Sequence, residues 1–191
     1  MTPNKTQDTG LRTKIDEKLS RWSVAAFGVG AAGEAVYLGL FNTFITIFYN
    51  QVIGLSNTLI GIAIFVALLV DAITDPLIGI ISDNWKSKHG RRHPFLFAAP
   101  IPLALAIYAI FNPPESILNG VDNFTNYVLF AWLASGTIFS RVFLTLYSIP
   151  HLALGGEMSK NHNQRSRLFS ANSAFSYVTG ALFGYLAWGV F

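Results

Sequence analysis

The hydrophobic residues of this chain gather in long stretches that short polar segments separate. Each stretch is close in length to the ~20 residues that a helix needs to cross the hydrocarbon of a membrane. Glycines and prolines, which favour turns, lie between the stretches. The five stretches are 23–49, 58–82, 95–111, 127–150 and 168–190. The pattern predicts an all-α, polytopic membrane helix bundle with five transmembrane helices.

Residues 1–21 are polar and precede the first stretch. A cleavable signal peptide would begin its apolar region much sooner, so we interpret this segment as an N-terminal tail and 22–191 as the transmembrane bundle. The chain stops at Phe191, directly after the fifth stretch. This favours a portion of a larger protein over a complete five-helix protein.

The composition agrees with a membrane protein. Charged residues are 12% of the 191 residues, about half of the roughly 25% that is typical of soluble domains. The absence of cysteine excludes disulfides, cysteine-based zinc sites and thiol catalysis. The formal net charge of +3 is too small to indicate a nucleic-acid partner.

The positions of Lys and Arg predict the orientation in the membrane. All 13 of these residues except Arg141 lie before the first stretch, between the second and third, or between the fourth and fifth. The segments 50–57 and 112–126, on the opposite side, contain none. Because basic loops stay in the cytoplasm, we expect a cytoplasmic N-terminus in a bacterial inner membrane.

Four charged residues lie inside the predicted spans: Glu34, Asp71, Asp75 and Arg141. Each costs about 2.5–3.5 kcal/mol at the membrane centre, so we expect these side chains to face a protein interior or an aqueous cavity. Glu34, Asp71 and Arg141 all fall roughly 15–20 Å from the cytoplasmic face at 1.5 Å per residue. Their shared depth favours one functional site over an ion-pair network that only holds helices together.

The spacing of these residues indicates a cation site. Asp71 and Asp75 are one helical turn apart with Thr74 beside them, and Arg141, Thr145 and Ser148 line one face of the fourth span. Carboxylate and hydroxyl oxygens suit a hard cation, and two close carboxylates also suit a shared proton. The hypothesis is therefore a coupling ion, Na⁺ or H⁺, with no organic cofactor and with Arg141 as its substitute when the ion is absent.

Polar residues also mark the fifth span, whereas the third span has no charge. We therefore expect the first, second, fourth and fifth spans to border a polar cavity and the third to pack outside them. The candidate cavity residues are Glu34, Arg141, Ser148, Asn172, Ser173 and Tyr177.

Three motifs carry a family resemblance. They are the stretch from Asp71 to Pro94 with its Gly90-Arg91-Arg92, the stretch from Leu146 to Ser159 with Gly155 and Glu157, and the short 52–56. In these motifs the chain closely resembles the glycoside–pentoside–hexuronide:cation symporters of the major facilitator superfamily, the group of the bacterial melibiose carrier.

The resemblance implies a twelve-helix transporter whose two six-helix halves rock about a central site. This chain would supply the first five helices, and its partner would be the C-terminal half of the same transporter. The family's cation-binding residues fall on Asp71 and Asp75, with Thr74 and Thr145 at the assisting positions. Its cytoplasmic latch, a set of charges that holds the two halves together, falls on Asp83, Arg91 and Arg92. We interpret Glu157 as a further member of this latch.

The sugar-binding positions depart from this resemblance. The melibiose carrier's acid in the first span falls on Ala35, next to Glu34, and its acid in the fourth span falls on Ser148. Its arginine in the fifth span falls on Ser173 and its stacking tryptophan on Leu152. We therefore expect a sugar or sugar-like solute without naming it.

An enzymatic alternative rests on the same acidic residues. Asp71, Asp75 and Asp83 superficially resemble the Asp-rich motif of a Mg²⁺-dependent membrane transferase that holds a pyrophosphate. Phosphate chemistry needs such acids at the aqueous interface, and Asp71 is predicted to lie deeper. Transport is therefore the leading hypothesis.

Overall fold

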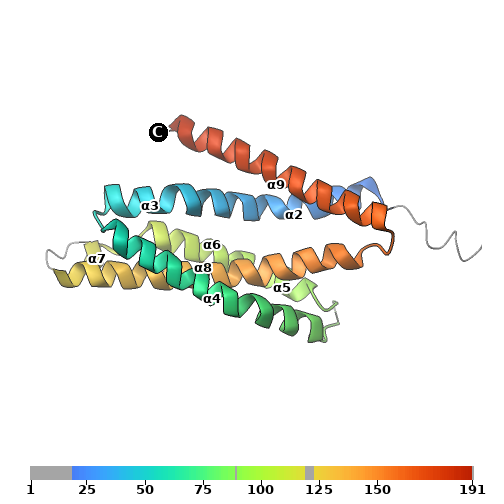
Figure 1. Ribbon diagram of the computed structural model, residues 1–191, viewed down its shortest axis with the longest axis horizontal. Coiled ribbons are helices and arrows are strands. Elements are labelled where there is room, and N and C mark those ends of the chain that lie inside the picture. The colour runs from blue at the N-terminus through green and yellow to red at the C-terminus, as the bar shows by residue number, and fades with distance from the viewer. Residues whose placement is uncertain (1–18, 89, 119–122, 191) are drawn as a thin grey trace, which may run out of the picture. The chain divides into compact units, whose positions relative to one another are not determined.

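The computed structural model describes residues 19–88, 90–118 and 123–190, and all secondary structure in these ranges is helical (Figure 1). Almost all of the predicted tail 1–21 lies outside the described residues. The helical segments, in chain order, are α2 Arg21–Gly39, the π-helical η1 Leu40–Phe44, α3 Ile45–Ile47, the π-helical η2 Phe48–Val52, α4 Asn57–Asn84, α5 His93–Ala98, α6 Pro100–Phe111, α7 Glu115–Leu118, α8 Asn123–Glu157 and α9 His162–Val190.

Four of the predicted spans coincide with helical segments that are long and apolar enough to cross a membrane: Arg21–Val52, Asn57–Asn84, His93–Leu118 and Thr125–Glu157. The fifth predicted stretch, 168–190, lies within helix α9 but does not reach the same apolar composition, since Asn, Ser, Gly and Tyr interrupt its hydrophobic residues. A fifth span therefore stays a prediction.

The helices run beyond the predicted spans at several ends. Helix α8 continues through Pro150 to Glu157, and α4 continues to Asn84. The turn before α4 needs Gly54, whose positive φ of 87° other residues rarely adopt. Ser56 then caps α4, because its hydroxyl accepts a hydrogen bond from the Leu59 amide at 3.4 Å.

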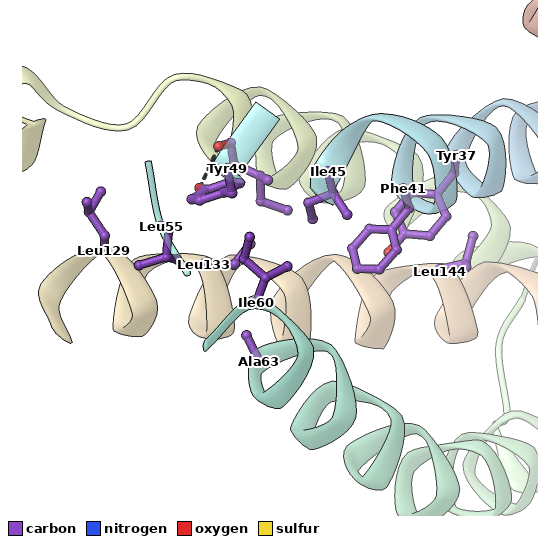
Figure 2. Close-up of a cluster of buried hydrophobic side chains, with 11 residues drawn as sticks. Tyr37, Phe41, Ile45, Tyr49, Leu55, Ile60, Ala63, Leu129, Leu133 and Leu144 are labelled. Atoms are coloured by element: carbon purple, nitrogen blue, oxygen red, sulfur yellow. Dashed lines mark hydrogen bonds between the residues drawn. The ribbon is translucent and has the colours of Figure 1, made fainter. Parts of the chain in front are cut away.

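The chain divides into two compact units, to both of which α2 and α8 contribute. One unit covers Tyr37–His151, and its core gathers buried side chains from the first span, α4, α6 and α8 (Figure 2). Tyr49 donates a hydrogen bond to the Ile110 carbonyl at 2.8 Å, and Trp132 donates one to the Ala109 carbonyl at 3.1 Å. These bonds fix α6 between the first span and α8.

The other unit combines residues up to Val36 with those from Leu152 onward. Its described helices approach closely at small residues, as the sequence of the first span favours. A Cβ on Gly28 would lie 2.5 Å from the ring of Phe175, and one on Gly155 would lie 2.4 Å from the ring of Phe27. Phe27 also packs edge-on against Phe169.

Candidate functional site

Two of the predicted intramembrane charges meet in an ion pair. An Nη1 atom of Arg141 on α8 lies 2.6 Å from Oδ2 of Asp71 on α4. Both side chains are largely buried, at 12% and 18% exposure. Asp71 and Arg141 therefore occupy the same level of the bundle, as their predicted depths require.

An aromatic ring supports the arginine of this pair. The guanidinium carbon of Arg141 lies 4.8 Å from the centroid of the Phe41 ring, which is buried on η1. Phe41 stacks on Tyr37 with 5.6 Å between ring centroids and 20° between ring planes. The positive guanidinium thus contacts both a carboxylate and the negative face of an aromatic ring.

Hydroxyl groups tie this stack to α8. Tyr37 and Ser140 share a hydrogen bond of 2.9 Å, and the Ser140 hydroxyl donates to the Thr137 carbonyl at 2.9 Å. With the Ser140 hydrogen on that carbonyl, Tyr37 is the donor to Ser140. The bond fixes the aromatic stack directly beside Arg141.

The ion pair leaves hydrogen-bonding capacity unused. Oδ1 of Asp71 and Nε of Arg141 are buried and have no hydrogen-bond partner among the described residues. A buried polar atom without a partner is costly, and a carboxylate oxygen is a ligand for a hard cation. Asp71 therefore has one oxygen engaged by Arg141 and one buried oxygen without a partner among the described residues.

The other predicted cation-site residues, Thr74, Asp75 and Thr145, lie on the same two helices as this pair. Asp75 is exposed one turn farther along α4, and no ion pair is recorded for it within the described ranges. The Thr74 hydroxyl donates to the Asp71 carbonyl at 3.4 Å, within its own helix. Thr145 is buried and Ser148 half-buried on α8. The structure thus joins Asp71 to Arg141 and does not draw Asp75 into the pair.

Pro76, directly after Asp75, changes the backbone of α4 at this level. It lies inside the helix and has no amide hydrogen for the carbonyl of Ala72. The Ala72 carbonyl therefore lacks its usual helical partner, and in the sequence Ala72 lies between Asp71 and Asp75.

The remaining cavity residues belong to the unit that starts before Val36 and resumes at Leu152. Glu34 and Asn172 are half-buried, whereas Ser173 and Tyr177 are exposed. Oδ1 of Asn172 is buried without a partner in the described part of the chain. A cavity shared by all four polar spans therefore stays a prediction.

The loop after α4 brings Arg92 onto Asp83, which lies near the end of that helix. Nη2 of Arg92 lies 2.7 Å from Oδ1 of Asp83, and Arg91 donates to the Asp83 carbonyl at 3.5 Å. Gly90 has a φ of 93°, which lets the chain turn back so that Arg92 reaches Asp83. Glu157 is exposed at the last position of α8, in the other unit.

Sequence reasoning found the charges of the site and missed its aromatic support. Phe41 and Tyr37 are two of many aromatic residues in an apolar stretch, so nothing in the pattern marks them. The π-helical segment that carries Phe41 has no sequence signal either.

Residues 26–191 match a known family, described as MFS/sugar transport protein. The chain is also similar to curated symporters. An uncharacterized symporter of Synechocystis sp. is 32% identical over 161 residues, which are 84% of this chain and 29% of that protein.

Two further relatives show how wide this group is. The inner membrane symporter YicJ of Escherichia coli is 25% identical over 87% of this chain and 34% of its own length. The sodium-dependent lysophosphatidylcholine symporter 1-A of Danio rerio is 28% identical over 87% of this chain and 29% of its own length. The chain spans about a third of the length of these relatives.

Proposed function

The chain belongs to the family of MFS/sugar transport proteins, whose relatives here are symporters, and from this we propose that it forms part of a cation-coupled symporter for a sugar or sugar-like solute. It is an integral membrane protein and not an enzyme, so the transferase alternative is set aside. The proposal concerns the coupling ion, the solute and the residues that serve them.

The observation that supports the proposal best is the half-satisfied ion pair of Asp71 and Arg141. With Arg141 on Oδ2, Asp71 is neutralised in the absence of an ion. A cation that binds the unpartnered Oδ1 competes with the guanidinium for the same carboxylate. Binding of the ion releases Arg141, whose donors are then free for the hydroxyl or acidic groups of a solute.

This exchange links the two binding events. If the ion frees the arginine that the solute needs, the ion raises the affinity for the solute, and by linkage the solute raises the affinity for the ion by the same factor. Asp75, Thr74 and Thr145 complete the proposed ion site. Na⁺ and H⁺ both satisfy this scheme, and the sodium dependence of the Danio relative favours Na⁺.

The residues proposed to bind the solute are the polar side chains that the sequence pattern of the spans predicts. These are Glu34, Arg141, Ser148, Asn172, Ser173 and Tyr177. The family description supports a sugar-like solute, although the Danio relative carries a lysophospholipid by its name. Asp83, Arg91, Arg92 and Glu157 are proposed as a cytoplasmic latch, in an inner membrane like that of the Escherichia coli relative.

The test uses the intact transporter that contains these residues, reconstituted in proteoliposomes. Jumps of Na⁺ concentration and of pH are applied without solute, and the transient charge displacement identifies the ion that binds. The same ion gradient is then offered with radiolabelled pentoses, hexoses and hexuronates. Asp71→Asn and Asp75→Asn are expected to abolish concentrative uptake, whereas Lys88→Gln, exposed in the loop after α4, retains it.

Concentrative uptake at the wild-type level in either aspartate variant would overturn the ion site. Absence of any charge displacement in the wild-type protein, by either ion, would overturn the proposed coupling itself.

A further inference from the structure

Phe41 contacts the only arginine that the described residues place within a predicted span, and it does so at the ion pair. Its ring centroid lies 4.8 Å from the guanidinium carbon of Arg141, whose Nη1 lies 2.6 Å from Asp71. The ring is 4% exposed, so little water competes for this contact. Cation–π attraction is strongest where the cation is desolvated in this way.

We propose that Phe41 is a positioning residue for ion coupling: its ring holds the guanidinium of Arg141 on Asp71 and thereby sets the affinity for the coupling ion. This inference rests on the proposed function and adds a residue that the charge pattern does not contain. Phe41 acts through Arg141 and does not touch the ion.

The backbone of the first span supplies the position of the ring. Phe41 lies in η1, a π-helical segment that follows nineteen residues of regular α-helix in α2. A π-helical turn holds more residues than an α-helical turn, so it rotates the residues that follow relative to an unbroken helix, and such turns are frequent at functional sites. Phe41 is the second residue of this segment, one helical turn after Tyr37, and its ring lies beside Arg141 of α8.

Tyr37 stacks on the ring of Phe41 and supports it. The two rings stack at 5.6 Å, and the hydroxyl of Tyr37 is bonded to Ser140, the residue before Arg141 in the chain. The ring and the guanidinium are therefore held by the same short segment of α8. This arrangement restricts the movement of Phe41 away from Arg141.

The arrangement predicts whether a weaker contact between Phe41 and Arg141 raises or lowers the affinity for the ion. An ion on Asp71 competes with Nη1 of Arg141, and the guanidinium has to withdraw from the carboxylate and from the ring together. The ring therefore strengthens the competitor of the ion. A weaker ring contact lowers the ion concentration at half-saturation, and a loss of cation–π attraction corresponds to about a threefold to tenfold decrease.

The experiment replaces Phe41 in the intact transporter by phenylalanine analogues with one, two and three ring fluorines. Fluorine withdraws charge from the ring face and changes its volume little, so the variants keep the packing of η1. Half-saturation of the charge displacement is measured with whichever ion acts on the wild-type protein. We expect it to fall stepwise with each fluorine, to fall further in Phe41→Leu and to stay near the wild-type value in Phe41→Tyr.

Two controls separate positioning from packing. Phe48, on the same span in η2, packs against Tyr49 and Phe111, so Phe48→Leu removes a comparable ring and should leave half-saturation unchanged. In an Arg141→Gln background the fluorine series should have no effect, since no guanidinium remains to be held.

A flat fluorine series in a protein whose wild type responds to the ion would overturn this inference and leave the proposed coupling intact. An equal fluorine effect in the Arg141→Gln background would also overturn it, because the ring would then act without the arginine. A wild-type protein that responds to neither ion would overturn the proposed function and this inference together.

Discussion

At the scale of single residues, the ion pair makes a prediction about stability that does not depend on transport. Arg141→Gln leaves Asp71 buried and without its cation, and removal of one partner from a buried pair costs about 3–5 kcal/mol. We expect Arg141→Gln to lower the temperature of thermal unfolding of the intact protein, and the coupling ion to recover more stability in this variant than in wild type.

The double variant Asp71→Asn with Arg141→Gln provides the control. It removes both charges, so its unfolding temperature should exceed that of Arg141→Gln alone and should no longer respond to the ion. If the single and the double variant unfold at the same temperature, the two side chains are not coupled as the structure places them.

The same residues show what a sequence can indicate at this scale. Charges inside apolar stretches are rare, so Asp71 and Arg141 stand out, and their depths along helices of known rise place them at one level. Phe41 carries no such signal, because an aromatic residue is as favourable in lipid or in the core as beside a cation. Its role depends on the contact with Arg141, which tertiary packing decides.

At the scale of helices, a prediction follows from the close approach of Gly155 on α8 to the ring of Phe27 on α2. A Cβ on Gly155 would meet three ring atoms of the buried Phe27 at 2.4, 2.9 and 3.1 Å, whereas a Cβ on the adjacent Gly156 would meet nothing within 4 Å. We expect Gly155→Ala to destabilise the protein by about 1–3 kcal/mol through overpacking. The free energy of unfolding in the intact protein measures it.

Gly156→Ala is the matched control, since it makes the same change one position along the same helix. It should be neutral or slightly stabilising, within about 1 kcal/mol, because alanine is the better helix former. Equal destabilisation by both variants would mean that helix flexibility, and not the contact with Phe27, is the reason for glycine at 155.

The helices themselves were largely predictable, and their irregular parts were not. Long apolar runs fix the existence of four spans because the membrane thickness sets their length. The π-helical segments η1 and η2 and the short helix α7 have no counterpart in the hydrophobic pattern. The π-helical segments carry Phe41 and Tyr49, which contact Arg141 and Ile110 on neighbouring helices.

At the scale of the whole molecule, the distribution of basic residues carries the proposed orientation. The loop between α4 and α5 holds Lys86, Lys88, Arg91 and Arg92, whereas the segment from Asn112 to Leu118 between α6 and α8 holds no basic residue. The positive-inside rule then places these two segments on opposite sides of the membrane. Whether α9 crosses the membrane is the point to test, because it is a long helix but less apolar than the four candidate spans.

The absence of cysteine from these 191 residues makes the orientation directly measurable in the intact transporter, after replacement of any cysteine elsewhere in it. Single cysteines are placed at Lys88, Glu115, Lys160 and Gly189, which are all exposed. A maleimide that does not cross membranes should label Glu115→Cys in intact cells, and Lys88→Cys and Lys160→Cys only after permeabilisation. If α9 crosses the membrane, Gly189→Cys is labelled in intact cells like Glu115→Cys. Labelling of Gly189→Cys only after permeabilisation would leave α9 on the side of Lys160, and the proposed solute residues Asn172, Ser173 and Tyr177 would then lose their place in a transmembrane cavity.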